Sequence, residues 1–168
     1  PGPGGGGPWL RCPVMVRPRG RHPAAGDLPM CGIAQGACLC GAIRFEVDWP
    51  SKWVAHCHCT MCRRAHGAAY VTWFGMQDHR VRIVDAQEAL HWYASSPGAE
   101  RGFCSQCGSS LFFRSERWPD ELHIALANLD GEADRAPMAH VYWDTHVTWA
   151  DTNPDDGLPR KPATDADL

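Results

Sequence analysis

The chain has 168 residues, a formal net charge of −3 and nine cysteines. The acidic balance argues against nucleic acid as a partner, and no apolar run reaches the length of a membrane span. An odd number of cysteines and the lack of a recognisable secretory signal argue against a disulfide-bonded secreted domain. These features predict a soluble, cytoplasmic protein whose cysteines stay reduced.

The first 29 residues differ in composition from the rest of the chain. They open with a run of glycine and proline, Pro1 to Pro8, and carry four arginines against a single acid, Asp27. This composition predicts disorder over 1–29. From Met30 onward we expect one domain with a modest core, over 30–159, and a short frayed tail over 160–168.

Short strands separated by turns follow along the domain. Stretches rich in β-branched and aromatic residues predict strands over 42–47, 53–57, 69–74, 81–84, 90–93, 110–113, 122–126 and 140–143. Few stretches are long enough for a helix of several turns, so we expect a mainly β domain of antiparallel strands with short helical turns. Five tryptophans in these stretches are expected to pack the sheets: Trp53, Trp73, Trp92, Trp143 and Trp149.

Seven cysteines lie in three clusters and divide into a four-sulfur set and a three-sulfur set. The four-sulfur set comprises the close pairs Cys38/Cys40 and Cys104/Cys107, each followed by a glycine where a tight turn is needed. Two such pairs are typical of a structural zinc held by four thiolates, although a single iron accepts the same ligands. Two further cysteines belong to no cluster: Cys12 and Cys31.

The three-sulfur set comes from the middle cluster, Cys57, Cys59 and Cys62. Cys57 and Cys59 would lie on one face of a strand, and Cys62 would fold back from a helical turn that Thr60 caps. Three protein ligands leave a position for water or substrate, which is typical of a catalytic zinc. If His66 supplies a fourth ligand from the same helical face as Cys62, the zinc is structural instead.

Other residues near the middle cluster are weaker candidates. His56 and His58 flank Cys57 and would point to the opposite strand face, which makes them poor ligands. His58 and His66 are candidates for moving a proton, because histidine titrates near neutral pH. Trp73 and Phe74 are expected to line a pocket beside the cluster. Three histidines in the later strands show no ligand spacing: His123, His140 and His146.

Three motifs carry a resemblance to a known family. They are Gly36-Ala-Cys-Leu-Cys-Gly-Ala-Ile-Arg-Phe45, Cys57-His-Cys-Thr-Met-Cys-Arg-Arg64 and Phe103-Cys-Ser-Gln-Cys-Gly108, and the segment 149–159 supports them. Over about residues 30–159 the chain resembles the glutathione-dependent formaldehyde-activating enzyme family, which includes the domain of centromere protein V. The resemblance implies coiled antiparallel sheets stapled by two zinc ions per chain. The four-sulfur set would be structural and the three-sulfur set catalytic.

The resemblance also implies an activity, that of a carbon–sulfur lyase joining or cleaving a thiol such as glutathione and an aldehyde such as formaldehyde. Glutathione carries two carboxylates, and Arg63 and Arg64 follow the zinc cluster where they could bind them. Paired arginines can also simply form a solvated face.

Two other functions fit the same cysteines. One is a zinc-stapled protein-binding module with two structural metals and no catalysis. The other is redox sensing, which requires oxidation of the middle cluster and release of its zinc. An open position at the three-sulfur set favours the enzyme, because a metal that only staples a fold is normally closed by four ligands.

Overall fold

The computed structural model describes residues 32–150 and 156–165. The predicted disordered segment over 1–29, together with Cys12 and Cys31, lies outside this part of the chain. Two β-sheets and one short α-helix, α1 (Thr60–His66), form the described domain, with four 3₁₀ turns: η1 (Asp78–Arg80), η2 (Leu126–Asn128), η3 (Trp143–Thr145) and η4 (Ala163–Asp165). The prediction of a mainly β fold is confirmed. No helix in the described ranges is both long enough and apolar enough to cross a membrane.

The smaller sheet has three antiparallel strands in the order β1 (Ile33–Ala37), β2 (Arg44–Asp48) and β5 (Val81–Val84). The turn between β1 and β2 holds the first cysteine pair. Alternate residues of β2 are fully buried, Phe45 and Val47, and they face the larger sheet as the period of two for a half-buried strand requires.

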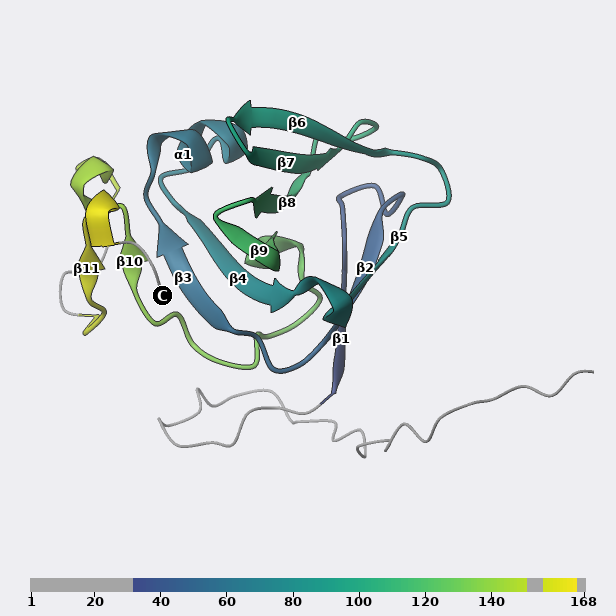
Figure 1. The fold of residues 1–168 in the computed structure, drawn as a ribbon, viewed down its shortest axis with the longest axis horizontal. Helices are drawn as coiled ribbons and strands as arrows, with labels where there is room; N and C mark the ends of the chain where they lie inside the picture. Colours follow the sequence, from purple (N-terminus) through teal and green to yellow (C-terminus); the bar gives the residue numbers. More distant parts are fainter. Residues whose placement is uncertain (1–31, 151–155, 166–168) are drawn as a thin grey trace, which may run out of the picture.

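The larger sheet has eight strands in the order β11-β10-β3-β4-β9-β8-β7-β6. Its six longer strands are antiparallel neighbours, and the two-residue strand β10 runs parallel to both β3 and β11. The bounds are β3 (Trp53–Cys57), β4 (Val71–Gln77), β6 (Leu90–Ser96), β7 (Ala99–Cys104), β8 (Ser110–Ser115), β9 (Trp118–Ala125), β10 (His140–Val141) and β11 (Arg160–Lys161). Figure 1 shows that this sheet curls, so that α1, which follows β3, lies beside β6 and β7.

The two faces of β4 serve two different clusters of buried side chains. Phe74 and Met76 pack with Phe45 and Phe112 in the core between the sheets, where the rings of Phe45 and Phe112 meet edge to face at 5.6 Å. Trp73 points the other way, into a second cluster with Cys57 and Cys62. Phe74 therefore does not line a pocket beside the middle cluster, because neighbouring strand residues point to opposite faces.

Three strands in the structure were not predicted: the two-residue β11, in the predicted tail, and the two longer strands β1 and β7. The sequences of β1 and β7, IAQGA and AERGFC, contain glycine and few β-branched residues, so local propensity does not reveal them. Gly36 in β1 is needed for packing, since a Cβ there would lie 2.2 Å from the Phe45 ring and 2.3 Å from the Asn128 carbonyl oxygen. Close approach of neighbouring chain segments, which is tertiary information, explains this glycine.

The last predicted strand is shorter than expected. It ends at Val141, because Tyr142 adopts a left-handed conformation (φ 57°) and Trp143 begins η3. Trp149 is 73% exposed, so the prediction that it packs a sheet is wrong. Trp73 is buried as predicted.

Candidate active site

The four-sulfur set lies where the turn after β1 meets the turn after β7. Cys38 and Cys40 come from the first turn, and Cys104 ends β7 just before Cys107. Both turns are closed in the same way, since the backbone N–H of Gly41 donates to the Cys38 carbonyl and that of Gly108 to the Cys104 carbonyl, at 3.0 and 2.8 Å. The two glycines have φ of 77° and 75°, which favours glycine at these positions, as expected after each cysteine pair.

The spacing of these four sulfurs fits a tetrahedral metal. All four lie within 4.8 Å of one another, and the Sγ atoms of Cys38 and Cys40 are 3.6 Å apart. The Sγ atoms of Cys40 and Cys104 are 3.8 Å apart. Zn–S bonds of 2.3 Å in a tetrahedron place sulfurs about 3.8 Å apart, whereas a disulfide needs about 2.05 Å. The set could therefore hold a metal ion such as zinc, and it would tie the two sheets together.

The three-sulfur set is built by the end of β3 and the start of α1. Cys57 is the last residue of β3, Cys59 is the N-cap of α1, and Cys62 lies in its first turn. The Sγ atom of Cys59 accepts a hydrogen bond from the backbone N–H of Cys62 at 3.2 Å, and the sulfurs of Cys57 and Cys62 are 3.5 Å apart. Thr60 is thus not the cap, because the Cys59 sulfur satisfies the free helical N–H instead.

Hydrogen bonds among the three sulfurs perturb their pKa values. Hydrogen bonds from the Cys57 and Cys62 thiols lower the pKa of Cys59 to about 2. The same contact with Cys59 raises the pKa of Cys57 well above its ordinary value. The close contacts thus move the pKa values of Cys59 and Cys57 in opposite directions, and a bound cation would favour the thiolate form of all three sulfurs. The three sulfurs lie within 4.8 Å of one another, as one metal ion requires.

His66, the candidate fourth ligand of the closed-site alternative, does not join the three sulfurs. Among the described residues, no histidine or carboxylate joins the grouping of Cys57, Cys59 and Cys62. The His66 ring packs edge-on against Trp73, with centroids 5.1 Å apart, and burial lowers its pKa to about 4. Its side chain lines a different surface groove.

His58 also points away from the sulfurs, as the strand alternation predicted. Its Nε2 lies 2.7 Å from Nδ1 of His140, and Nε2 of His140 lies 2.7 Å from a carboxylate oxygen of Asp156. Because the carboxylate accepts, His140 Nε2 donates to it, and His58 Nε2 in turn donates to His140. Burial lowers the pKa of His58 to about 4. This row of hydrogen bonds connects Asp156, through His140, to the loop between β3 and α1.

Arg101 is a site residue that the sequence did not reveal. This residue of β7 is only 7% exposed, and both of its Nη atoms lie 3.7 Å from the Sγ atom of Cys62. Its guanidinium also stacks over the ring of Phe113 at 5.0 Å. A buried cation needs a countercharge, and the sulfurs supply it. The signal available in the sequence was an arginine three residues before Cys104, in a strand that was not predicted.

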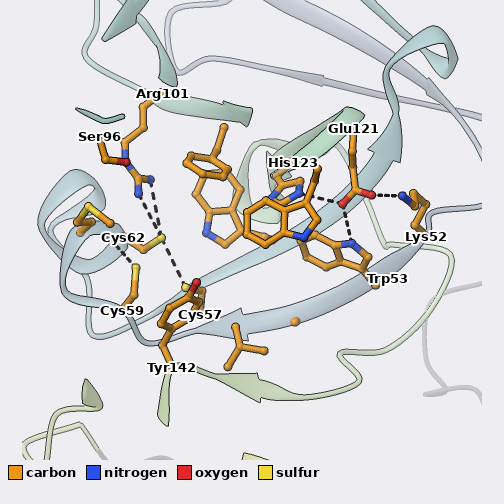
Figure 2. A pocket seen from close by; sticks show the side chains of 16 residues that line it. Lys52, Trp53, Cys57, Cys59, Cys62, Ser96, Arg101, Glu121, His123 and Tyr142 are labelled. Atoms are coloured by element: carbon orange, nitrogen blue, oxygen red, sulfur yellow. Dashed lines mark hydrogen bonds and ion pairs between the residues drawn. The ribbon is translucent and has the colours of Figure 1, made fainter. Parts of the chain in front are cut away.

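A cavity of about 200 Å³ opens beside the three sulfurs. One row of register partners crosses the sheet beneath it: Trp53, Gly75, His123, Phe113 and Arg101. Gly75 leaves room for the Trp53 indole, which a Cβ at that position would approach to 2.5 Å. Figure 2 shows Arg101 and the sulfurs at one end of the cavity and Lys52, Trp53, Glu121 and His123 at the other.

The far end of the cavity is held by a buried carboxylate. Glu121 accepts hydrogen bonds from Trp53 Nε1 and His123 Nε2, both at 2.9 Å, and pairs with the ammonium of Lys52. Burial alone would raise the pKa of Glu121, but the bonds from His123, Lys52 and Trp53 outweigh it and hold the pKa at about 2. This network fixes the rings of Trp53 and His123 in the cavity wall.

Arg63 and Arg64, the predicted partners of glutathione carboxylates, lie on α1. Arg63 is half-buried and donates from Nε to the His58 carbonyl at 3.2 Å, and Arg64 is exposed. Neither belongs to the described residues that line the cavity. Their role in binding stays a prediction. Trp73 does line the cavity, as expected.

A family model and a curated relative identify the same family. Residues 33–145 match the family model described as glutathione-dependent formaldehyde-activating enzyme. A Halomonas elongata protein, provisionally named as such an enzyme, is 30% identical over 127 residues, which cover 71% of this chain and 80% of its own length. An uncharacterised lyase of Schizosaccharomyces pombe is 34% identical over 79 residues, covering 47% of this chain and 56% of its own length.

A solved structure shows a similar fold. The crystal structure of a Rhodobacter sphaeroides protein aligns with a TM-score of 0.50 at 22% sequence identity, covering 75% of this chain and 98% of the other. At this level of identity the likeness concerns the fold alone.

Proposed function

Because the chain belongs to the glutathione-dependent formaldehyde-activating enzyme family, we propose that it is a zinc-dependent carbon–sulfur lyase acting on a thiol and an aldehyde. The four-sulfur set would hold a structural zinc and the three-sulfur set a catalytic one. The names of the matched relatives, an enzyme that activates formaldehyde and a lyase, support this assignment.

One observation carries the proposal: three sulfurs and a buried guanidinium lie together at one end of a cavity. A purely structural metal site gains nothing from a cavity beside it, and it normally has four protein ligands. Perturbed titratable groups in a concave, mainly apolar pocket are typical of an active site.

A zinc ion held by the three-sulfur set would keep an incoming thiol deprotonated near neutral pH and would polarise a carbonyl oxygen. In the reaction itself, the sulfur of the thiol forms a bond to the carbonyl carbon, the C=O π bond breaks, and the oxygen takes the proton that the thiol lost. Arg101, at the sulfur end of the cavity, favours negative charge there, and the aromatic walls limit the access of water.

Uncatalysed addition of thiols to formaldehyde is fast, so the test must separate catalysis from background. We expect the zinc-loaded protein to speed the exchange of formaldehyde between its free form and its glutathione adduct, measured by NMR exchange spectroscopy at equilibrium. Cys59→Ser should lose this effect while its far-UV circular dichroism stays unchanged. Equal exchange rates with and without wild-type protein would contradict the proposal.

Arg63 and Arg64 provide a test of which thiol is bound. If their guanidinium groups bind the carboxylates of glutathione, Arg63→Ala or Arg64→Ala should raise its half-saturating concentration about tenfold, with little change in turnover, since a charged hydrogen bond is worth about 1.5–3 kcal/mol. Arg82→Met is the control, because Arg82 is exposed and paired with Glu46 in the smaller sheet. An unchanged half-saturating concentration in both alanine variants would mean that these arginines do not contact the thiol.

A further inference from the structure

The walls of the cavity are more apolar than formaldehyde and glutathione require. Five aromatic side chains line it: Trp53, Trp73, Phe113, Trp118 and Tyr142. Ala55, Met61 and Val141 add further apolar surface. Formaldehyde has two non-hydrogen atoms, whereas the cavity of about 200 Å³ is several times the ~30 Å³ that one water occupies in the liquid. A bound formaldehyde would leave most of these rings uncovered.

The cavity is also long enough for a substrate larger than formaldehyde. Trp53, Ala55 and Cys57 lie on one face of β3 and line it from end to end. Cys57 lies four residues after Trp53, and four steps of about 3.3 Å along a strand span about 13 Å. The sulfurs at one end and the Glu121 network at the other are therefore separated by more than the length of a six-membered ring.

The charged groups in the wall are already engaged. The two lysine or arginine side chains among the described lining residues are Lys52, which pairs with Glu121, and Arg101, which contacts Cys62 and Phe113. Glu121 is 5% exposed and accepts from Trp53 and His123 besides Lys52. A carboxylate inside the cavity would therefore have to displace an existing partner, whereas an apolar group would not.

The rings are held in place before any ligand enters. His123 is surrounded by Trp53, Phe113 and Trp118, with ring centroids 4.7, 5.3 and 5.2 Å away. Its bond to Glu121 fixes the ring plane. Such a rigid aromatic wall favours planar rings, which meet it edge to face or offset, and little ordering remains to oppose binding.

We propose that the substrate whose reacting atom meets the three-sulfur set carries an apolar, ring-bearing body, such as an aryl group, and that this body fills the cavity between the sulfurs and Glu121. The inference rests on the proposed reaction and specifies its substrate class. The ring can belong to the thiol or to the aldehyde, and two experiments distinguish these sources.

The first experiment uses protein loaded with cobalt and measures thiol binding from the visible cobalt absorption. If the ring belongs to the thiol, phenylmethanethiol should bind at least about tenfold more tightly than 2-sulfanylethanol, since burying a ring gains more than burying a short polar chain. The second experiment fixes the thiol and compares benzaldehyde with formaldehyde, each catalysed rate being divided by its own background. A ratio that is at least about tenfold higher for benzaldehyde assigns the ring to the aldehyde.

Two variants test whether the preference for phenyl-bearing substrates arises in the cavity. Trp118→Ala should reduce the phenyl preference to near unity, whereas Trp149→Ala should retain it, because Trp149 is 73% exposed and does not line the cavity. Absence of any phenyl preference in both wild-type experiments overturns the inference, and a cobalt band that still responds to thiols then leaves the proposed function standing. A band that responds to no thiol contradicts both.

Discussion

Cys104→Ser is expected to give insoluble or unfolded protein, whereas Cys59→Ser should fold normally and lose activity. The sulfur of Cys104 has no exposed surface and lies in the main core, where it joins β7 to the turn after β1. Metal binding at a structural site contributes on the order of 10 kcal/mol to folding, which is comparable to the whole net stability of a domain of about 5–15 kcal/mol. Losing this ligand set removes most of what stabilises the fold.

Cys59→Ser should fold normally because the substitution keeps the helix cap. Cys59 is the N-cap of α1, and serine is one of the best N-cap residues, so the helix should keep its capping hydrogen bond. Solubility, thermal melting and zinc content would measure both variants. The wild type should hold about two zinc ions per chain and Cys59→Ser about one, given one ion for each ligand set. Two equally stable variants would contradict the division into structural and catalytic sets.

Arg101→Met is expected to weaken metal binding at the three-sulfur set by about 10- to 100-fold, the range found when groups that support metal ligands are removed. Three thiolates around a divalent ion leave one net negative charge, and the guanidinium 3.7 Å from the Cys62 sulfur neutralises it. Methionine keeps the packing against Phe113 but not the charge, so the fold should remain stable.

Competition with a chromogenic chelator would measure this affinity, and Arg101→Lys should recover part of it. Arg114→Met is the matched control. Arg114 lies in the neighbouring strand, stacks over Trp92 at 4.0 Å and pairs with Glu100 at 2.6 Å, and it is not among the described residues that line the cavity. If Arg101→Met holds the metal as tightly as wild type, the guanidinium does not compensate the charge of the sulfur set.

The grouping of seven cysteines into two sets was predictable from the sequence because the spacing within each cluster is short. Close cysteine pairs followed by glycine specify the two turns that build the four-sulfur set, and the structure brings all four sulfurs together as expected. The three-sulfur set depends only on the end of one strand and the first turn of one helix. Short spacing in the chain thus determines the three-sulfur set, whereas in the four-sulfur set it positions only the sulfurs within each pair, and packing of the two sheets brings the pairs together.

The cavity could not be predicted in the same way, because its walls come from register across the curled sheet. Arg101, Phe113 and His123 become neighbours only when β7, β8 and β9 pair, and β7 itself has weak strand propensity. Glu121 and His123 carry no recognisable motif, yet pairing brings them to the Trp53 indole. The cap at Cys59 was also missed, since a cysteine sulfur replaces the usual hydroxyl as the acceptor.

The proposed reaction requires that the three-sulfur set hold a metal with a position open to a thiol. We would replace zinc by cobalt and titrate the visible cobalt absorption with glutathione, because the band reports on the metal's ligands. We expect a saturable change in the spectrum of wild-type protein and none in Cys59→Ser. A wild-type spectrum that glutathione, 2-sulfanylethanol and phenylmethanethiol all leave unchanged would show that the site is closed, and the protein would then be a zinc-stapled module rather than a thiol-dependent lyase.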